Sequence, residues 1–258
     1  MKKKYEFTDE ILEWKGLTLH RIRALKNFWD VKAGDLGGWI QSESNLSQKD
    51  NCWIYDEAKV YASAKISKHA TISDKAIVCG HAVVSGMAMV SNSAYIHDDA
   101  QVINCATVKD SAEISDYARI QDNAIISGHA IINGISIIKG QPSIKDNAVV
   151  SNSNVCGNAV IKECAKVFAS SYIAGNAIVS GTVWIQSSQI FDGADVSGAV
   201  TIIESKVHGY SRIKLAADPK IHNQDIYDKI ILSKTDLENF KNTESTLCGL
   251  TNIKFIEI

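Results

Sequence analysis

The chain has 258 residues, enough for one large domain or two small ones. Its 27 basic and 29 acidic residues give a formal net charge of −2, so no global field favours nucleic acid or an anionic membrane. It has only two prolines and contains no apolar run long enough to span a bilayer, which predicts a folded cytoplasmic protein rather than a disordered or membrane protein.

Residues 1–36 are expected to form an N-terminal cap for the repeats that follow. This part of the chain is rich in long and aromatic side chains, and residues 17–25 alternate apolar and polar side chains as a strand does. A stack of parallel turns needs its open end covered against edge pairing. The early tryptophans Trp14, Trp29, Trp39 and Trp53 should therefore pack within the cap, whereas a partly exposed cluster of them would indicate a ligand or protein contact.

A six-residue repeat follows. Every sixth residue from Ala58 up to residue 148 is alanine, interrupted only by Ser136 and Pro142, and the residue two places after each of these positions is always Val or Ile. Another two residues on, the column that begins at Asp74 contains only Asp, Asn and Gly, which tolerate a left-handed backbone. Each hexad therefore carries its own turn.

This pattern predicts short strands that coil. Side chains alternate along a strand, so the small residue and the β-branched residue face inward while the residue between them faces water. A turn in every hexad allows only a few residues in each strand, and six is not a helical period. Three hexads should make one turn of roughly 18 residues, with turns stacked about 4.8 Å apart. The expected fold class is all-β, a single-stranded parallel β-helix.

We expect this coil to span residues 37–213. Two five-residue units, Ser153–Gly157 and Ser188–Asp192, interrupt the hexads in its second half. These breaks, like Ser136 and Pro142, indicate either simple drift of the repeat or a bulged surface for a partner.

Residues 214–258 are expected to form a C-terminal cap. Thr235–Glu238 has the sequence of a capping box and predicts a short helix through about Lys241. The alternating segment Ile253–Ile258 predicts a closing strand.

The N-terminal block also carries a resemblance. Its segments Asp30–Gly34, Gly37–Ile40, Asn45–Ser47 and Cys52–Asp56 resemble those of the YdcK-like hexapeptide-repeat proteins of bacteria and their phages. The resemblance implies a left-handed coil, and handedness comes from it alone because parallel crossovers are otherwise nearly always right-handed. Members of this group are usually labelled transferases, since the wider superfamily contains many acyl-CoA-dependent acyltransferases. Fold analogy by itself does not fix function.

For an enzyme, the resemblance implies acetyl-CoA or another acyl-CoA as donor and a histidine as general base in a groove between the subunits of a trimer. No cofactor motif is evident in the sequence itself. His81 and His129 are the candidate catalytic residues, because each follows a turn glycine that would let a ligand approach the backbone. Together with His69 they precede the alanine column, and their spacings are not multiples of 18, so we expect three outward-facing histidines on different edges. The alternative is that each is an ordinary surface histidine.

Other candidate sites are few. Trp39, Trp53 and Asp56 are the candidate binding residues, within the block that carries the resemblance. The six cysteines include no C-x-x-C pair, so neither a metal site nor a compact disulfide framework is predicted.

Two functions of different classes remain open. The first is a non-catalytic binding or interaction scaffold. The second is an acyltransferase that acts at a groove between subunits. We favour the scaffold, because no insertion leaves the repeat between Ala58 and Val150 to cover an acceptor, and acyl transfer would need a neighbouring subunit to complete the pocket. No nucleic-acid or membrane partner is expected.

Overall fold

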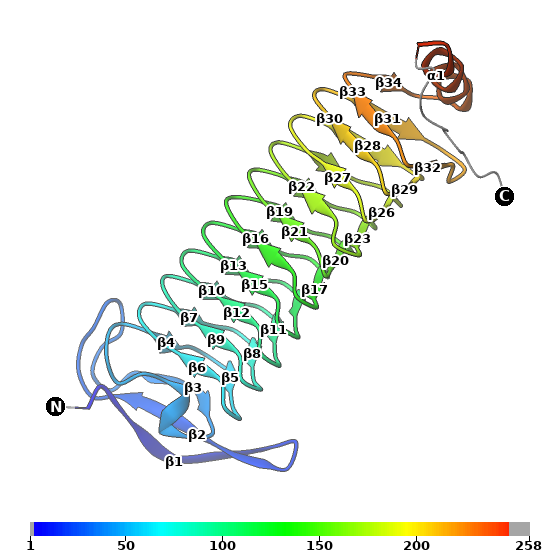
Figure 1. Cartoon of the computed structure of the whole chain (residues 1–258). Coiled ribbons are helices and arrows are strands. Elements are labelled where there is room, and N and C mark those ends of the chain that lie inside the picture. The colour runs from blue at the N-terminus through cyan, green and yellow to red at the C-terminus, as the bar shows by residue number, and fades with distance from the viewer. Residues whose placement is uncertain (1–2, 248–258) are drawn as a thin grey trace. The chain divides into compact units, whose positions relative to one another are not determined.

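Very short parallel strands, stacked turn upon turn, build the fold of this computed structural model, which describes residues 3–247 and the side chains of residues 3–240. The chain forms two units, Met1–Ile135 and Ser136–Ile258. Within each unit, the strands form three sheets that are the faces of a parallel β-helix (Figure 1). The expected all-β, parallel β-helix fold is confirmed.

The first unit contains a hairpin, a 3₁₀-helix (Glu43–Asn45) and three sheets. One sheet has the order β1 (Tyr5–Trp14), β2 (Leu17–Ala24), β3 (Leu36–Ile40), β5 (Lys59–Val60), β8 (Ile77–Val78), β11 (Tyr95–Ile96), β14 (Glu113–Ile114), β17 (Ile131–Asn133). The second has the order β4 (Trp53–Ile54), β7 (Thr71–Ile72), β10 (Met89–Val90), β13 (Thr107–Val108), β16 (Ile125–Ile126). The third has the order β6 (Lys65–Ile66), β9 (Val83–Val84), β12 (Gln101–Val102), β15 (Arg119–Ile120).

The second unit repeats this arrangement and ends in a helix, α1 (Lys234–Leu247). One sheet has the order β20 (Val149–Ser151), β23 (Lys166–Phe168), β26 (Trp184–Gln186), β29 (Thr201–Ile203), β32 (Lys220–His222). The second has the order β19 (Ser143–Ile144), β22 (Val160–Ile161), β25 (Ile178–Val179), β28 (Asp195–Gly198), β31 (Arg212–Leu215), β34 (Ile230–Ile231). The third has the order β18 (Ile137–Ile138), β21 (Asn154–Val155), β24 (Tyr172–Ile173), β27 (Gln189–Ile190), β30 (Lys206–His208), β33 (Asp225–Tyr227).

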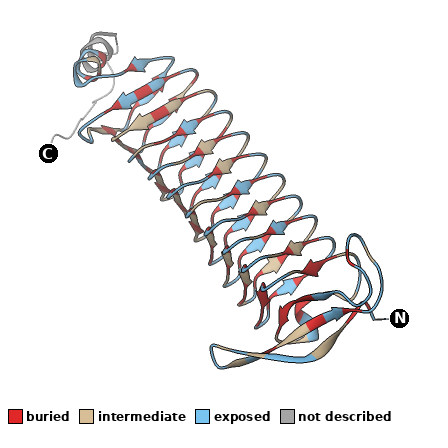
Figure 2. Cartoon of the chain, turned by 180° about the vertical axis from the view of Figure 1, so that it is seen from behind, coloured by how far each residue is buried: buried red, intermediate tan, exposed pale blue. Residues whose placement is uncertain are grey.

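From Trp53 onward, the register of the first unit follows the repeat. Trp53 pairs with Thr71 and Thr71 with Met89, so one turn takes three hexads, as predicted. The alanine column and the Val/Ile column are buried, while the residues between them are largely outside, as the alternating colours of Figure 2 show. The turn column has the expected left-handed backbone, with φ of 58° at Asp74 and 57° at Asn92.

Turn side chains also link neighbouring turns of the first unit. The backbone N–H of Asp74 donates to Oδ2 of Asp56 over 3.1 Å, and that of Asn92 donates to Oδ2 of Asp74 over 2.8 Å. Further along the same ladder, Gly128 donates to Oδ2 of Asp110 over 2.9 Å. An aspartate at this position therefore satisfies a backbone donor at an exposed corner.

In the second unit, the breaks in the repeat carry an internal ladder of serines. Its buried members are Ser153, Ser171, Ser188 and Ser205. The backbone N–H of each of the last three serines donates to the hydroxyl of the serine one turn earlier, over 3.0–3.2 Å. Each hydroxyl also donates to a nearby carbonyl, such as that of Gln186 at 2.6 Å from Ser188. The serines fill the place of alanine and supply hydrogen bonds where a pentad shortens the turn, as between Tyr172 and its partner Gln189.

The coil continues past residue 213, where the sequence had placed its end. Strands β32, β33 and β34 still pair in parallel with β29, β30 and β31. The hexad register fails here because Thr201 pairs with Lys220, so this turn exceeds three hexads by one residue. The buried residues Ile221, Ile226 and Ile231 then recur at every fifth position.

Helix α1 begins after Ser233. The backbone N–H of Asp236 donates to Oγ of Ser233 over 3.1 Å, and that of Leu232 donates to Oδ2 of Asp236 over 3.0 Å. The predicted helix is confirmed, but it is longer than expected, and its N-terminus is capped by Ser233 and Asp236 rather than by the predicted Thr235 and Glu238. The predicted strand Ile253–Ile258 lies outside the described residues. No helix within residues 3–247 is long and apolar enough to cross a membrane.

The N-terminal hairpin covers more than the end of the coil. Strands β1 and β2 are antiparallel, and β2 pairs with β3, the first strand of the coil (Figure 1). Leu19 and Trp39 pack with Tyr61 and Cys79, which lie on the outer surface beside β5 and β8. The hairpin thus shields part of one outer face as well as the open end.

Lys4 donates hydrogen bonds to backbone carbonyl oxygens at that open end. Its side chain is fully buried, and its ammonium donates to the carbonyl oxygens of Cys52, Lys49 and Asp50 at 2.8, 3.3 and 3.5 Å. The ammonium also lies 5.3 Å from the centre of the Phe28 ring. A single side chain therefore satisfies carbonyls that have no further turn to pair with.

Candidate binding site

A hollow of about 410 Å³ lies on the outer surface of strands β4, β7 and β10 in the first unit. We call it the Trp29 groove. It is lined by Trp29, Asp30, Asn51, Tyr55, Asp56, His69, Thr71, Ser73, Met87 and Met89. Its size is within the range of small-molecule sites, about 300–1,000 Å³.

A tight turn presents Trp29 to this groove. Phe28 and Val31 exchange two backbone hydrogen bonds of 3.0 and 2.9 Å, so Trp29 and Asp30 form a two-residue loop. Trp29 has a φ of 48°, which is rare for a bulky residue, and its side chain is 72% exposed. Phe28 anchors the turn by packing edge-on against buried Trp53 at 5.4 Å. The indole is therefore held outside the core on a fixed support.

Part of the lining is apolar. Met87 and Met89 are both about half exposed, at 54% and 49%, although large apolar side chains are costly to leave in water. The ring of His69 lies 6.4 Å from the Trp29 ring, centre to centre. That ring makes no hydrogen bond or ion pair with any described residue, so the groove holds no nucleophile–base pair built on this histidine.

Another part of the lining is acidic. The hydroxyl of Tyr55 donates to Oδ1 of Asp30 over 2.7 Å, and Asp56 follows Tyr55 directly at the turn. Burial, the hydrogen bond to Asp30 and the charges of Asp30 and Asp56 all raise the pKa of Tyr55. The groove lining contains these two carboxylates and neither lysine nor arginine. These carboxylates place negative charge in the groove.

The predicted binding residues separate in the structure. Asp56 lines the Trp29 groove. Trp53 is buried in the core, and Trp39 is buried beneath the hairpin with its indole N–H donating to Oε2 of Glu57 over 3.0 Å. These two tryptophans belong to the core of the cap, whereas Trp29 is exposed.

The candidate catalytic histidines face solvent at separate corners, as expected. His81 and His129 are exposed and precede β9 and β17, while His69 precedes β7, so the three lie beside three different sheets. His81 lines a second hollow of about 380 Å³ together with Ser63 and Lys65. Its Nδ1 lies 3.8 Å from Oδ1 of Asp99, too far for a hydrogen bond. The His129 ring has no polar partner among the described residues.

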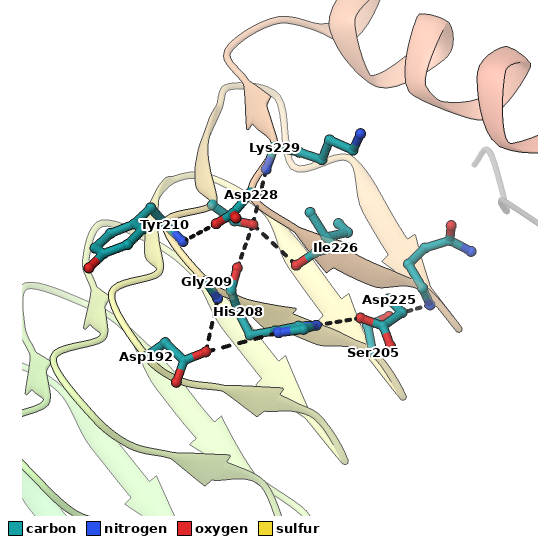
Figure 3. A network of polar contacts seen from close by, with 11 residues as sticks. Asp192, Ser205, His208, Gly209, Tyr210, Asp225, Ile226, Asp228 and Lys229 are labelled. Atoms are coloured by element: carbon teal, nitrogen blue, oxygen red, sulfur yellow. Dashed lines mark hydrogen bonds and ion pairs between the residues drawn. The ribbon is translucent and has the colours of Figure 1, made fainter.

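His208, in the second unit, was not among the candidates and is far more constrained. Its Nε2 lies 2.7 Å from Oδ1 of Asp225, and its Nδ1 lies 4.0 Å from Oδ2 of Asp192 (Figure 3). Its ring stacks on Phe191 at 4.8 Å and lies 4.9 Å from Tyr227. His208 therefore ties three successive turns together.

His97 is held in a similar way in the first unit. Its Nδ1 lies 2.9 Å from Asp98, its Nε2 lies 3.0 Å from Glu113, and its ring stacks on Tyr95 at 4.3 Å. Because both ring nitrogens contact carboxylates, neither is open to a substrate. Hexad spacing alone did not reveal these clusters, since partners such as Glu113 and Asp225 come from adjacent turns of the coil.

Fold and repeat together define the chain as a hexapeptide-repeat parallel β-helix protein. A stretch of 43 residues is 51% identical to the uncharacterized acetyltransferase YdcK of Escherichia coli (strain K12), which confirms the expected resemblance over 17% of this chain. The match covers 13% of that protein's length, so its name says nothing about the remainder of this chain. No family model matches the chain.

Proposed function

We propose that this protein is a non-catalytic binding module and that the Trp29 groove is its recognition surface. The observation that carries the proposal is Trp29 itself, a large apolar side chain that is 72% exposed and has a left-handed backbone. Exposure and backbone strain both cost stability, and such features concentrate at sites that bind ligands.

The histidine geometry supports a binding role over a catalytic one. A general base needs an orienting neighbour and a free nitrogen within reach of the substrate. The His129 ring lacks the neighbour among the described residues, and both nitrogens of His97 already contact carboxylates.

We expect the 258-residue chain to bind N-phenyl-1-naphthylamine, a fluorophore that is uncharged at neutral pH, in the Trp29 groove. Trp29→Ser should weaken this binding by about tenfold, because an aromatic contact contributes roughly 0.5–1.5 kcal/mol beyond area burial. Fluorescence titration gives the dissociation constants.

The matched control is Tyr117→Ser, which removes another exposed aromatic ring of the first unit that does not line the groove. It should leave the dissociation constant unchanged. Equal weakening by both variants, or no saturable binding to the wild type, would rule out the groove as the recognition surface.

Acyl transfer is the second candidate function, favoured by the partial identity to a protein named as an acetyltransferase and by the hollow beside His81. In this alternative an acyl-CoA would be the donor, His81 or His129 the base, and a second or third copy of the chain the other wall of the site. The catalytic role of these histidines stays a prediction.

We expect His81→Ala and His129→Ala to leave acetyl transfer from acetyl-CoA to amine or hydroxyl acceptors at the wild-type background. The physical reason is that Asp99 is too far away to orient His81, and no described residue orients His129. Release of free CoA thiol can be followed with a thiol reagent. Saturable acetyl-CoA turnover by the wild type that either substitution abolishes would establish the enzyme instead.

A further inference from the structure

We infer that the ligand of the Trp29 groove is a small organic amine, with a protonated nitrogen attached to an apolar body. This inference rests on the proposed binding function and specifies its ligand. Its basis is that apolar and acidic side chains line a single hollow.

The acidic part of the lining is the reason for a positive charge on the ligand. One oxygen of Asp30 accepts the Tyr55 hydroxyl and one oxygen of Asp56 accepts the Asp74 backbone N–H. The other oxygen of each carboxylate accepts no hydrogen bond from the described residues. Two carboxylates with spare acceptor capacity and no cationic neighbour in the groove favour a cation and repel an anion.

The apolar part of the lining is the reason for an apolar body on the ligand. The indole face of Trp29 attracts a cation through its quadrupole, and two thioethers offer a polarizable contact to hydrocarbon or an aromatic ring. The side chains of Met87, Met89 and Trp29 supply no oxygen ligand of the kind that Ca²⁺ requires. Within the described residues no group of His, Cys, Asp and Glu side chains forms a metal site.

The dimensions set the size of the ligand. A hollow of about 410 Å³ accommodates one ring and a short chain, rather than an extended polymer. The turn that carries Trp29 is fixed by two backbone hydrogen bonds, so the site needs no folding to form.

The test compares three probes that differ in charge: phenethylamine, 2-phenylethanol and 3-phenylpropanoate. Each is titrated by calorimetry or by displacement of N-phenyl-1-naphthylamine from the 258-residue chain. Phenethylamine should bind about tenfold more tightly than the alcohol, and the carboxylate more weakly than both. Raising the salt from about 0.05 M to about 0.5 M should weaken the amine but not the alcohol.

Asp30→Asn and Asp56→Asn should each weaken the binding of phenethylamine about fivefold and leave the dissociation constant of N-phenyl-1-naphthylamine unchanged. Both substitutions remove a charge while keeping an oxygen acceptor, and asparagine tolerates the φ of 51° at Asp56. Asp110→Asn is the matched control, because Asp110 belongs to the same ladder as Asp56 but does not line the groove. It should change the dissociation constant of neither probe.

The outcomes separate the two proposals. If the neutral fluorophore binds through Trp29 but the alcohol matches the amine, the amine ligand is wrong and the groove is merely apolar. If Nα-acetyl-lysine N-methylamide binds more tightly than phenethylamine, the occupant is a peptide side chain rather than a small amine, and the inference is overturned. If the fluorophore does not bind in the groove, the binding function itself fails.

Discussion

Lys4→Met is expected to lower the free energy of unfolding by about 3 kcal/mol, because it removes the ammonium donor from the buried carbonyl oxygen of Cys52 and from two partly buried carbonyl oxygens beside it. Methionine keeps most of the volume of lysine but cannot donate to the carbonyls of Lys49, Asp50 and Cys52. Burial lowers the pKa of Lys4, whereas the neighbouring Cys52 raises it. Urea denaturation followed by tryptophan fluorescence measures the effect, since Trp53 lies in the adjacent core.

Lys3→Met is the matched control for this experiment. Lys3 forms an exposed ion pair of 2.8 Å with Glu43, and pairs of this kind contribute about 0–1 kcal/mol. Its loss should hardly shift the denaturation midpoint. If both variants unfolded at the same urea concentration as the wild type, Lys4 would have no role in closing the coil.

Ala118→Leu is expected to destabilise the protein by about 1–3 kcal/mol through overpacking. Ala118 is fully buried in the alanine column, between the buried side chains of Ile114 and Ile120 along the chain. The interior has no room for three further carbon atoms without movement of the backbone or of neighbouring rotamers. The shift of the urea midpoint is the measurement.

Arg119→Leu provides the comparison at the next residue. Arg119 is exposed on the outside of β15, so leucine there adds no volume to the core and should be nearly neutral. Equal midpoints for the two leucine variants would contradict the inward and outward register of the strand.

The coil could be predicted from the sequence because its periodicity is local. Alanine, an aliphatic residue and a turn residue recur within each hexad, and together they determine which side chains face inward. The register beyond residue 213 could not, because the turn from Thr201 to Lys220 carries one residue more than three hexads and shifts the buried isoleucines to a spacing of five. The five-residue units that begin at Ser153 and Ser188 were predicted only as interruptions of the repeat, whereas the hydroxyls of these two serines accept buried backbone N–H groups from the next turn.

The candidate site was only partly predictable. Asp56 was a candidate and does line the groove, but Trp29 was expected to pack inside the cap like Trp39 and Trp53. A tryptophan inside a core and one on a hairpin tip look alike in a sequence. What separates them is the turn between Phe28 and Val31, which depends on tertiary packing against Trp53.

From Trp53 onward, the turn length of the first unit is constant, so its outward side chains are regularly spaced. Moving three hexads along the chain moves one step of about 4.8 Å up the same face, from Thr71 to Met89 and then to Thr107. Outward side chains can therefore be substituted one position at a time, while the buried alanine and Val/Ile columns stay unchanged. A recognition surface on such a coil can evolve, or be moved to a neighbouring turn, by substituting a few residues at intervals of 18 positions. The rest of the protein need not be redesigned.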